Sequence, residues 1–353
     1  MPKITHRIKS KLKVLLIQAI DQSRTFIQSQ FATTVDLANC LSDIFCNPGF
    51  AVKTQTGAME CMLTAYFGED DIFLSIVSNC SIFICSDKKD GKTNFSCIDN
   101  NFVESVNNLR NYSNDLSHIA TQTLAGFTTK TNFRHFHLPA NIRLLTYSCK
   151  TENIASYMKE NTSIYQAIAN QANAILPSGE SLNQFRSVVK SALRHNGNGH
   201  TKAEPYNEIA KASLAKCFDS SQPIKSIPIK ETQRHALCKD LVMWGYSNVD
   251  LPLSLELAIQ TLHTTRASLS QGCKETLGIG PMEILRYIRL EHVYKALASS
   301  EIRKELNLQN VEQIREHYGF MSRGNFAATY KACFGERPKE TQLKSMLKVS
   351  VPG

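Results

Sequence analysis

The strongest constraint on this chain is a repeat in its C-terminal third, where the sequence matches itself at an offset of 57 residues. Each copy reads as a helix, a short turn, a second helix, and a glycine followed three residues later by a proline. The matched pairs are Leu269 and Phe326, Cys273 and Tyr330, Lys274 and Lys331, Leu277 and Phe334, Gly278 and Gly335, and Pro281 and Pro338. This spacing is typical of helix-turn-helix units, whose second helix enters the major groove of DNA.

The first copy predicts a supporting helix at 255–262 and a reading helix at 265–277. Ser254 and Thr265 are residue types that cap helix N-termini well, and His263-Thr264 makes the predicted turn. At about 100° per residue, the reading helix turns a set of side chains away from its partner or onto the flank: Arg266, Ala267, Ser270, Gln271 and Lys274.

These outward side chains suit different contacts with DNA. Gln271 can form two hydrogen bonds with adenine, Ser270 can donate or accept at any base, and the methyl group of Ala267 can touch that of thymine. Arg266 and Lys274 suit phosphate groups, which set the register of a protein on DNA. A solvated polar helix face is the plain alternative, and the repeat favours DNA binding over it.

The second copy predicts a supporting helix at 311–318, a turn at Gly319-Phe320 and a reading helix at 322–333. Its outward and flanking side chains are Arg323, Gly324, Asn325, Ala327, Ala328 and Lys331. Few of these groups read bases. We therefore expect this copy to hold the DNA backbone and sense its shape, with Arg323 and Asn325 the best candidates for a base contact.

One continuous helix is predicted between the copies, from Met282 to Ser299, after a proline at 281 that suits a first helical turn. At ~1.5 Å per residue it spans ~27 Å, near the ~34 Å between successive major-groove faces on one side of a duplex. A rigid helix of this length would place both reading helices along one side of DNA.

These motifs resemble the DNA-binding domain of the AraC/XylS family of bacterial transcription regulators, over roughly Arg234–Leu343. The resemblance rests on Gly278–Pro281, Leu285–Leu290, Ala296-Leu297, Tyr318–Phe320, Phe326, Tyr330-Lys331 and Phe334–Pro338. Asn325–Ala327 and Pro338–Thr341 are most similar to the branch that contains the ethanolamine-operon regulator. A weaker N-terminal resemblance, to the cupin-like sensor domains of that branch, rests on Gly126-Phe127, Leu138–Ala140 and Leu144–Thr146.

The resemblance implies a sequence-specific regulator that binds double-stranded promoter DNA, works with RNA polymerase and responds to a small-molecule effector. It implies a multi-domain α and β fold, with a cupin-like β-sandwich or barrel at 1–155, a helical dimerisation or linker region at 156–230, and an all-α double helix-turn-helix domain at 231–345. Effector binding would act by changing the geometry of the linker.

Two residues depart from the family pattern. Arg315 stands where the family usually has a small residue, equivalent to Ala258 in the first copy, so we expect its side chain to extend to solvent or widen the helix crossing. Gly272 lies inside the first reading helix, where it costs up to ~1 kcal/mol relative to alanine.

Before the repeat, residues 50–149 read as β structure, with short apolar or alternating runs between turn clusters. The predicted strands are 50–54, 61–67, 72–77, 81–85, 125–130, 133–137 and 142–147, a spacing typical of a sandwich or barrel. Helical periodicity follows at 164–176, 180–193 and 206–218, and an extended linker is predicted at 219–229. The apolar stripes of the first two helices suit packing against the barrel or, alternatively, a homodimer seam.

Charge and cysteine content indicate which partners and which cell compartment suit the chain. The net charge of +9 divides as +5 over 1–20, −1 over 21–200, +2 over 201–230 and +3 over 231–353, which permits phosphate binding without establishing it. Eleven cysteines without a CxxC pair or a secretory leader indicate reduced thiols in a cytoplasm. The N-terminal lysines precede only a short apolar run, so a surface helix is predicted there, and no stretch is long enough to span a membrane.

Signals for an enzyme are weak. His135 and His137 alternate on one predicted strand as cupin metal ligands do, with Glu152 and His118 as candidate partners, but the acidic ligand at cupin spacing is missing. Gly197–Gly199 reads as a linker, and Cys80 and Cys85 read as buried thiols. We therefore predict no catalytic residue, metal or cofactor; the alternative is a cupin-type small-molecule or metal-dependent enzyme with an accessory helical tail.

Overall fold

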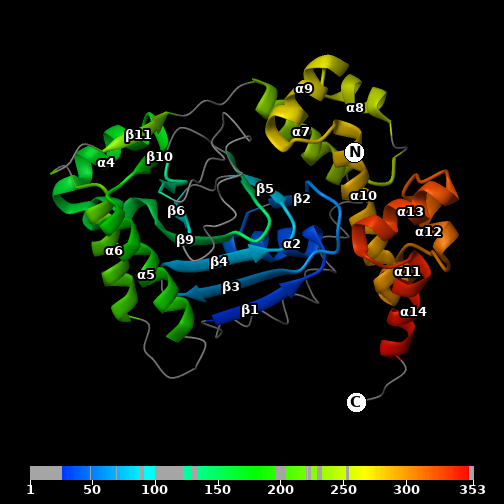
Figure 1. Cartoon of the computed structure of the whole chain (residues 1–353), viewed down its shortest axis with the longest axis horizontal. Helices are drawn as coiled ribbons and strands as arrows, with labels where there is room; N and C mark the ends of the chain where they lie inside the picture. Colours follow the sequence, from blue (N-terminus) through cyan, green and yellow to red (C-terminus); the bar gives the residue numbers. More distant parts are fainter. Residues whose placement is uncertain are drawn as a thin grey trace.

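The computed structural model describes residues 26–47, 49–68, 70–87, 91–99, 122–128, 133–195, 204–219, 221, 224–228, 233–251 and 254–349. A β-rich N-terminal half and a helical C-terminal half lie side by side (Figure 1). The helix expected within 1–20, His118 and the Gly197–Gly199 segment lie outside the described residues. No helix in the described part of the chain is long and apolar enough to cross a membrane.

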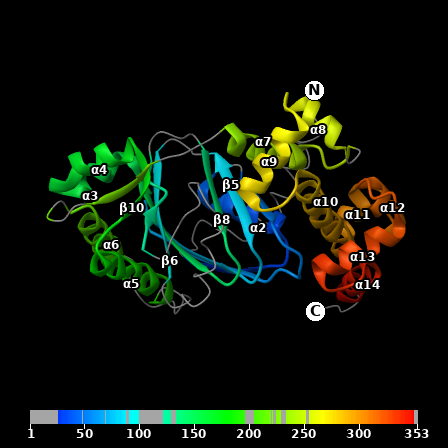
Figure 2. The ribbon, with the colours of Figure 1, turned by 45° about the horizontal axis from the view of Figure 1, so that its top comes forward.

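Two antiparallel sheets form the N-terminal half (Figure 2). The larger sheet has the order β1-β3-β4-β9-β6-β7-β10-β11 and the smaller one the order β2-β5-β8. The strands are β1 (Phe26–Phe31), β2 (Gly49–Lys53), β3 (Cys61–Phe67), β4 (Ile72–Ser78), β5 (Ile82–Asp87), β6 (Lys92–Ile98), β7 (Leu124–Ala125), β8 (Phe133–Leu138), β9 (Arg143–Lys150), β10 (Ala172–Leu176) and β11 (Lys225–Pro228).

Alternation of side chains along the strands gives the larger sheet two apolar faces. Leu74 on β4 belongs to a buried cluster that includes Ile82 and Ile84 of the smaller sheet and residues of α2 (Thr34–Phe45). Tyr147 on β9 belongs to a second cluster, which contains Phe185 of α5. The first cluster forms an apolar layer between the two sheets, and the second forms an apolar layer between the larger sheet and helices.

The second apolar layer is covered by the helices that follow β9 (Figure 2). These are α3 (Ile154–Met158), α4 (Thr162–Ala169), α5 (Gly179–His195) and α6 (Glu204–Cys217), with single turns of 3-10 helix at Thr151–Asn153 and Lys159–Asn161. The predicted apolar stripe of α5, including Leu182, Phe185 and Val189, is buried in this layer. That stripe is therefore used within the chain, which favours packing against the sheet over a homodimer seam.

Two elements correct the expectations for this region. The predicted helix at 164–176 ends at Ala169, and its remainder is strand β10. The predicted linker at 219–229 contains β11, which pairs with β10 and so extends the larger sheet. Pairing between segments some fifty residues apart decides both cases, and periodicity within a short window does not detect such pairing.

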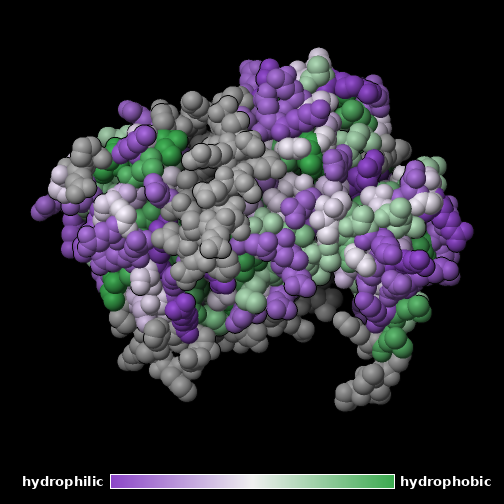
Figure 3. All heavy atoms as spheres, viewed as in Figure 1, coloured by the Kyte–Doolittle hydropathy of each residue, from purple (hydrophilic) through white to green (hydrophobic). Residues whose placement is uncertain are grey.

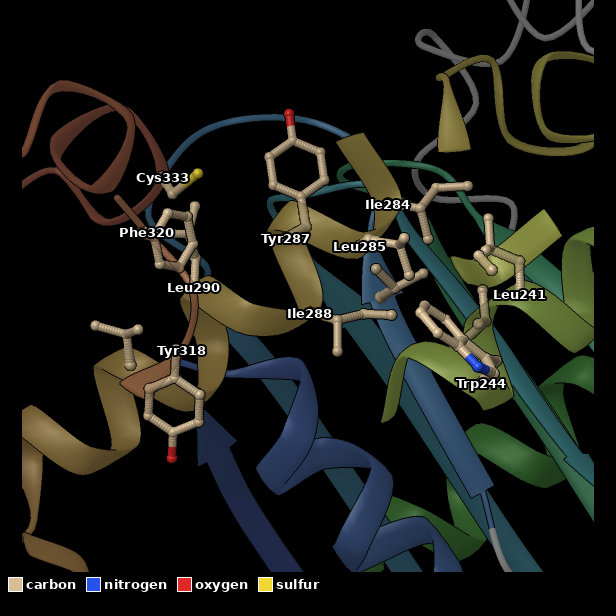
Figure 4. Packing of buried hydrophobic residues seen from close by; sticks show 14 of the residues in the cluster. Leu241, Trp244, Ile284, Leu285, Tyr287, Ile288, Leu290, Tyr318, Phe320 and Cys333 are labelled. Atoms are coloured by element: carbon tan, nitrogen blue, oxygen red, sulfur yellow. The ribbon is translucent and has the colours of Figure 1, made fainter. Parts of the chain in front are cut away.

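The C-terminal half consists of α7 (Gln233–Ser247), α8 (Leu255–Thr261), α9 (Arg266–Leu277), α10 (Pro281–Ala298), α11 (Ser300–Glu305), α12 (Val311–His317), α13 (Arg323–Phe334) and α14 (Pro338–Val349). Their apolar residues surround α10, as Figure 4 shows for Trp244 and Leu241 of α7 and for Tyr318 and Phe320. This cluster also takes in Val52, Phe83 and Cys85 from the smaller sheet. The two halves of the chain thus share one apolar core.

All eleven cysteines are free thiols, and all but Cys46 are buried. His137, one of the two strand histidines, has its Nε2 atom 2.9 Å from the Thr54 hydroxyl and 2.7 Å from the Ser81 hydroxyl. Burial lowers the pKa of His137 to about 4, so this imidazole is neutral at physiological pH. Across the described residues, no group of three or more His, Cys, Asp or Glu side chains is placed to hold a metal ion.

Candidate nucleic-acid interface

The first helix pair is α8 and α9, and both helices begin at side-chain caps. The Ser254 hydroxyl accepts a hydrogen bond from the Leu257 N–H at 3.2 Å, and the Thr265 hydroxyl accepts one from the Ser268 N–H at 3.2 Å. His263 in the turn has a φ of 49°, which reverses the chain within a few residues. Both predicted caps and the predicted turn are confirmed, and the reading helix begins one residue later than expected.

One face of α9 packs tightly against α7. Leu269, Cys273 and Leu277 are buried on this face. A Cβ atom added at Gly272 would lie 2.6 Å from the Arg234 carbonyl oxygen, closer than real Cβ contacts allow. The glycine that the sequence marks as unfavourable is therefore the residue that lets the reading helix approach its neighbour.

The opposite face of α9 presents the side chains predicted to meet DNA. Arg266, Ala267, Gln271 and Lys274 are exposed, and Ser270 is half-buried. On the face of the molecule that Figure 3 shows, the surface over α8 and α9 is mostly hydrophilic.

Two carboxylates hold polar side chains of this face. Glu256 pairs with Arg266. Glu275 Oε1 accepts hydrogen bonds from Gln271 Nε2 and from Arg234 Nη1, each at 2.8 Å. The role of Glu275 was not predicted, although its position four residues after Gln271 is the signal for such a contact.

The second helix pair, α12 and α13, has the same design. Asn310 accepts a hydrogen bond from the Gln313 N–H at 2.9 Å, and Ser322 accepts one from the Asn325 N–H at 3.5 Å. Gly319 in the turn has a φ of 78°, a conformation that favours glycine. The second reading helix begins one residue later than predicted and extends to Phe334.

The exposed face of α13 differs in chemistry from that of α9. All six predicted residues are exposed: Arg323, Gly324, Asn325, Ala327, Ala328 and Lys331. Phe326 and Tyr330 lie on the buried face, with their ring centroids 5.8 Å apart. The exposed face thus carries two cations and one amide among small side chains.

Arg315 behaves differently from the expectation. Of the two expected outcomes, extension to solvent is wrong, because the side chain is 5% exposed and its guanidinium lies beside two carboxylates. The other outcome, a wider helix crossing, stays a prediction. Nη2 is 2.6 Å from Glu312 Oε1 and 2.9 Å from Glu316 Oε1, and Nη1 donates to the Phe320 carbonyl. The arginine thus ties the supporting helix to the turn that follows it.

The predicted helix between the pairs is confirmed as α10, Pro281–Ala298. Ile284 and Ile288 are fully buried, so α10 forms the centre of the helical half and not a free connection (Figure 4). Its 18 residues at ~1.5 Å each give ~27 Å.

The N-terminal half contacts α10 and α13 through a buried lysine. The Lys53 ammonium donates to the carbonyls of Gly57 at 3.0 Å and Cys333 at 2.9 Å, and lies 3.6 Å from Glu291 Oε1. It also lies 4.6 Å from the ring centroid of Phe334. Since Cys333 is in the last turn of α13, Lys53 holds the C-terminal end of the second reading helix.

Further polar contacts surround this lysine. The Thr34 N–H donates to Glu291 Oε2 at 2.9 Å, and the Gly57 N–H donates to the Ala332 carbonyl at 2.9 Å. Burial raises the pKa of Glu291 to about 7, although Lys53 acts to lower it. The contact between the two halves thus combines apolar packing with a buried, charged centre.

Comparison with known proteins supports the assignment of the helical half. A family model described as a helix-turn-helix domain matches residues 259–344. The XylDLEGF operon transcriptional activator 2 of Pseudomonas putida is 26% identical over 139 residues, which cover 39% of this chain and 83% of that protein. The probable thc operon regulatory protein of Rhodococcus erythropolis is 32% identical over 89 residues, covering 25% of this chain and 26% of that protein.

Among solved structures, ToxT from Vibrio cholerae O395 aligns over 86% of this chain and 99% of its own, at 12% identity and a TM-score of 0.28. A score this low does not show a common fold. The family match and the capped helix pairs establish the class of protein. Residues 259–344 form a helix-turn-helix domain, and the chain is a DNA-binding regulator of transcription.

Proposed function

We propose that the protein binds promoter DNA through two helix-turn-helix motifs, α8–α9 and α12–α13, and responds to a small-molecule effector through its N-terminal half. The observation that carries this proposal is the exposure of both outward faces, on two capped helix pairs that pack around one central helix. The residues assigned to DNA are Arg266, Ala267, Ser270, Gln271, Lys274, Arg323, Gly324, Asn325, Ala327, Ala328 and Lys331. Gln271 reads a base, and the cations contact phosphates.

The proposal divides the chain into a cupin-like sensor domain at 1–155, a region at 156–230 and the DNA-binding domain at 231–345. The helices of the middle region cover the larger sheet, and its strands β10 and β11 extend that sheet. The two-sheet arrangement of the N-terminal half supports the first part. The ethanolamine-operon branch is the proposed place of the chain within its family. RNA polymerase is the proposed protein partner, in the cytoplasm, and a homodimer would need a surface other than the buried stripe of α5.

Coupling between effector and DNA is proposed to pass through the contact between the halves. Lys53 lies at the end of β2 and touches both α10 and α13, so a change in the smaller sheet would move the second reading helix directly. This route differs from the linker geometry that the sequence suggested. It is supported by the shared apolar core and by the buried ion pair.

The test compares two variants on duplexes selected by the full-length protein from a random-sequence pool. Gln271→Ala should relax the preference at one base pair by ~1–3 kcal/mol, because its side chain contacts the edge of one base. Lys331→Ala should weaken all duplexes alike and reduce the dependence of binding on salt, because it removes a phosphate contact.

If Gln271→Ala lost the same affinity for selected and random duplexes, Gln271 would not read a base. The alternative, a cupin-type enzyme, predicts that the N-terminal half is active without the helical half. Catalytic turnover that survives deletion of residues 231–353 would favour it over the regulator.

A further inference from the structure

The turn before the second reading helix exposes an apolar side chain that the sequence analysis did not assign. Met321 is 83% exposed, more than any other exposed large hydrophobic side chain in the described residues. It lies directly before Ser322, the N-cap of α13. A single exposed apolar residue is common on protein surfaces, so exposure alone assigns nothing to it.

Met321 does not take the usual structural role of an apolar residue just before an N-cap, because other side chains pack in that place. A residue just before an N-cap commonly packs against the fourth residue of the helix, which in α13 is Phe326. Phe326 is 3% exposed and packs instead on Phe320, with ring centroids 5.3 Å apart, and on Tyr330. Met321 therefore turns its apolar surface outward, beside the reading helix.

The surroundings of Met321 fit close approach to DNA. Arg323 is 79% exposed in the first turn of α13, where it can hold a phosphate. A Cβ atom added at Gly324 would meet nothing within 4 Å, so the backbone is open to a groove. Ala327 and Ala328 continue the exposed face with methyl groups. This end of α13 thus offers apolar contacts next to one phosphate-binding cation.

We propose that Met321 contacts the 5-methyl group of a thymine in the major groove, so that the second motif reads sequence through an apolar contact. This inference rests on the proposed function, in which α13 enters the groove. Apolar contact with the thymine methyl group is an established form of base readout. A thioether side chain is flexible and polarisable, which suits it to such a contact. The equivalent residue of the first motif is the polar Thr264.

The experiment uses the full-length protein and a duplex that it has selected from a random-sequence pool. Each thymine of the site is replaced in turn by deoxyuridine, which removes the methyl group and leaves the hydrogen-bonding edge unchanged. We expect one replacement to weaken binding about four-fold, the effect of exposing one buried methyl group, and to map to the part of the site that the second motif covers.

Variants then assign this loss to a side chain. Met321→Ala should weaken binding to the thymine duplex and abolish the difference between thymine and deoxyuridine at that position. Met321→Leu, which keeps a similar apolar volume, should retain the difference. Leu347→Ala on α14, which alters another exposed apolar side chain (68% exposed), should behave as the unaltered protein.

The proposal is overturned if Met321→Ala binds the duplex as tightly as the unaltered protein, or if the deoxyuridine penalty persists in that variant. A loss of transcription control by Met321→Ala without a change in DNA affinity would also overturn it, and would point to a protein contact. Failure of the full-length protein to prefer any duplex at low salt would instead refute the proposed function.

Discussion

Two glycines show that the same residue type can be required by its neighbours in one copy of the repeat and not in the other. Gly272 and Gly324 both lie in reading helices, where glycine costs up to ~1 kcal/mol relative to alanine. Only Gly272 is required by a neighbour, because the α7 backbone lies 2.6 Å from the place of its Cβ. Gly324 has open space at that place. Sequence alone cannot separate the two, because the difference lies in what packs against them.

The two glycines therefore predict opposite effects of alanine. Gly272→Ala should lower the free energy of unfolding by ~1–3 kcal/mol, because the added methyl forces α9 away from α7. Gly324→Ala should leave it unchanged or raise it by up to ~1 kcal/mol, through better helix propensity. Urea unfolding of the two variants under the same conditions measures both. Equal effects would contradict the close approach of the two helices.

At the scale of elements, local signals predicted the ends of the two reading helices to within one residue and the strands less well. Caps at Ser254 and Thr265 were predicted from residue type, because a cap is a contact between near neighbours. Strands β10 and β11 were missed because each is stabilised by a partner distant in sequence. Arg315 does not extend to solvent as one alternative expected, since its partners include the Phe320 carbonyl in the following turn.

Replacing Arg315 by leucine tests that assignment. Arg315→Leu keeps apolar volume but leaves the buried Phe320 carbonyl without its donor, so we expect a loss of ~1–3 kcal/mol in unfolding free energy. Binding to DNA should weaken on all sequences, because the turn positions α13 without reading bases. The ratio of affinities for selected and random duplexes should stay constant. A stability equal to that of the unaltered protein would show that leucine is equally suitable at this position.

At the scale of the whole molecule, a buried charged centre joins the two halves. Lys53 and Glu291 have side chains exposed by 1% and 0%, and each touches elements of both halves. A buried pair of this kind adds little net stability over apolar residues of the same size, but removing one partner is costly. We therefore expect this pair to favour one specific contact between the halves.

A double-mutant cycle measures this centre. Lys53→Met should destabilise the protein by ~3–5 kcal/mol, because Glu291 is left buried without its cation. The double variant Lys53→Met with Glu291→Leu should recover most of that loss. Lys150→Met, which removes the exposed ion pair with Asp70, is the matched control and should cost at most ~1 kcal/mol. An additive cycle would contradict coupling across the two halves.

The same centre predicts a dependence on pH. Since the pKa of Glu291 is about 7 in the folded protein, above its ordinary value of 4.5, its contribution to stability is present at acid pH and lost as the pH rises through 7. The neighbouring His292, whose pKa burial lowers to about 4, acts in the opposite direction as the pH falls below its ordinary value of 6.5. Asp36 and Lys295 also face these two groups.

Comparison with Glu291→Gln isolates the carboxyl group, because His292 is common to both proteins. Between about pH 5 and 7, the unaltered protein should lose stability relative to Glu291→Gln by roughly 1 kcal/mol per pH unit. Denaturant titrations of both proteins across this range measure the difference. A constant difference would show that Glu291 keeps its ordinary pKa in the folded protein.

The sequence alone determined the helical half in outline: two helix pairs, the caps of the first pair, their outward residues and the helix between them. Caps form between near neighbours, and a repeat is found by comparing the sequence with itself, so both can be detected without a structure. The tertiary structure decided the rest, including the tight contact at Gly272, the pairing of β10 with β11, and the burial of Lys53 between α10 and α13. Each of these features depends on contacts between groups that are distant in sequence and come together only when the chain folds. The periodicity of the sequence does not predict such contacts.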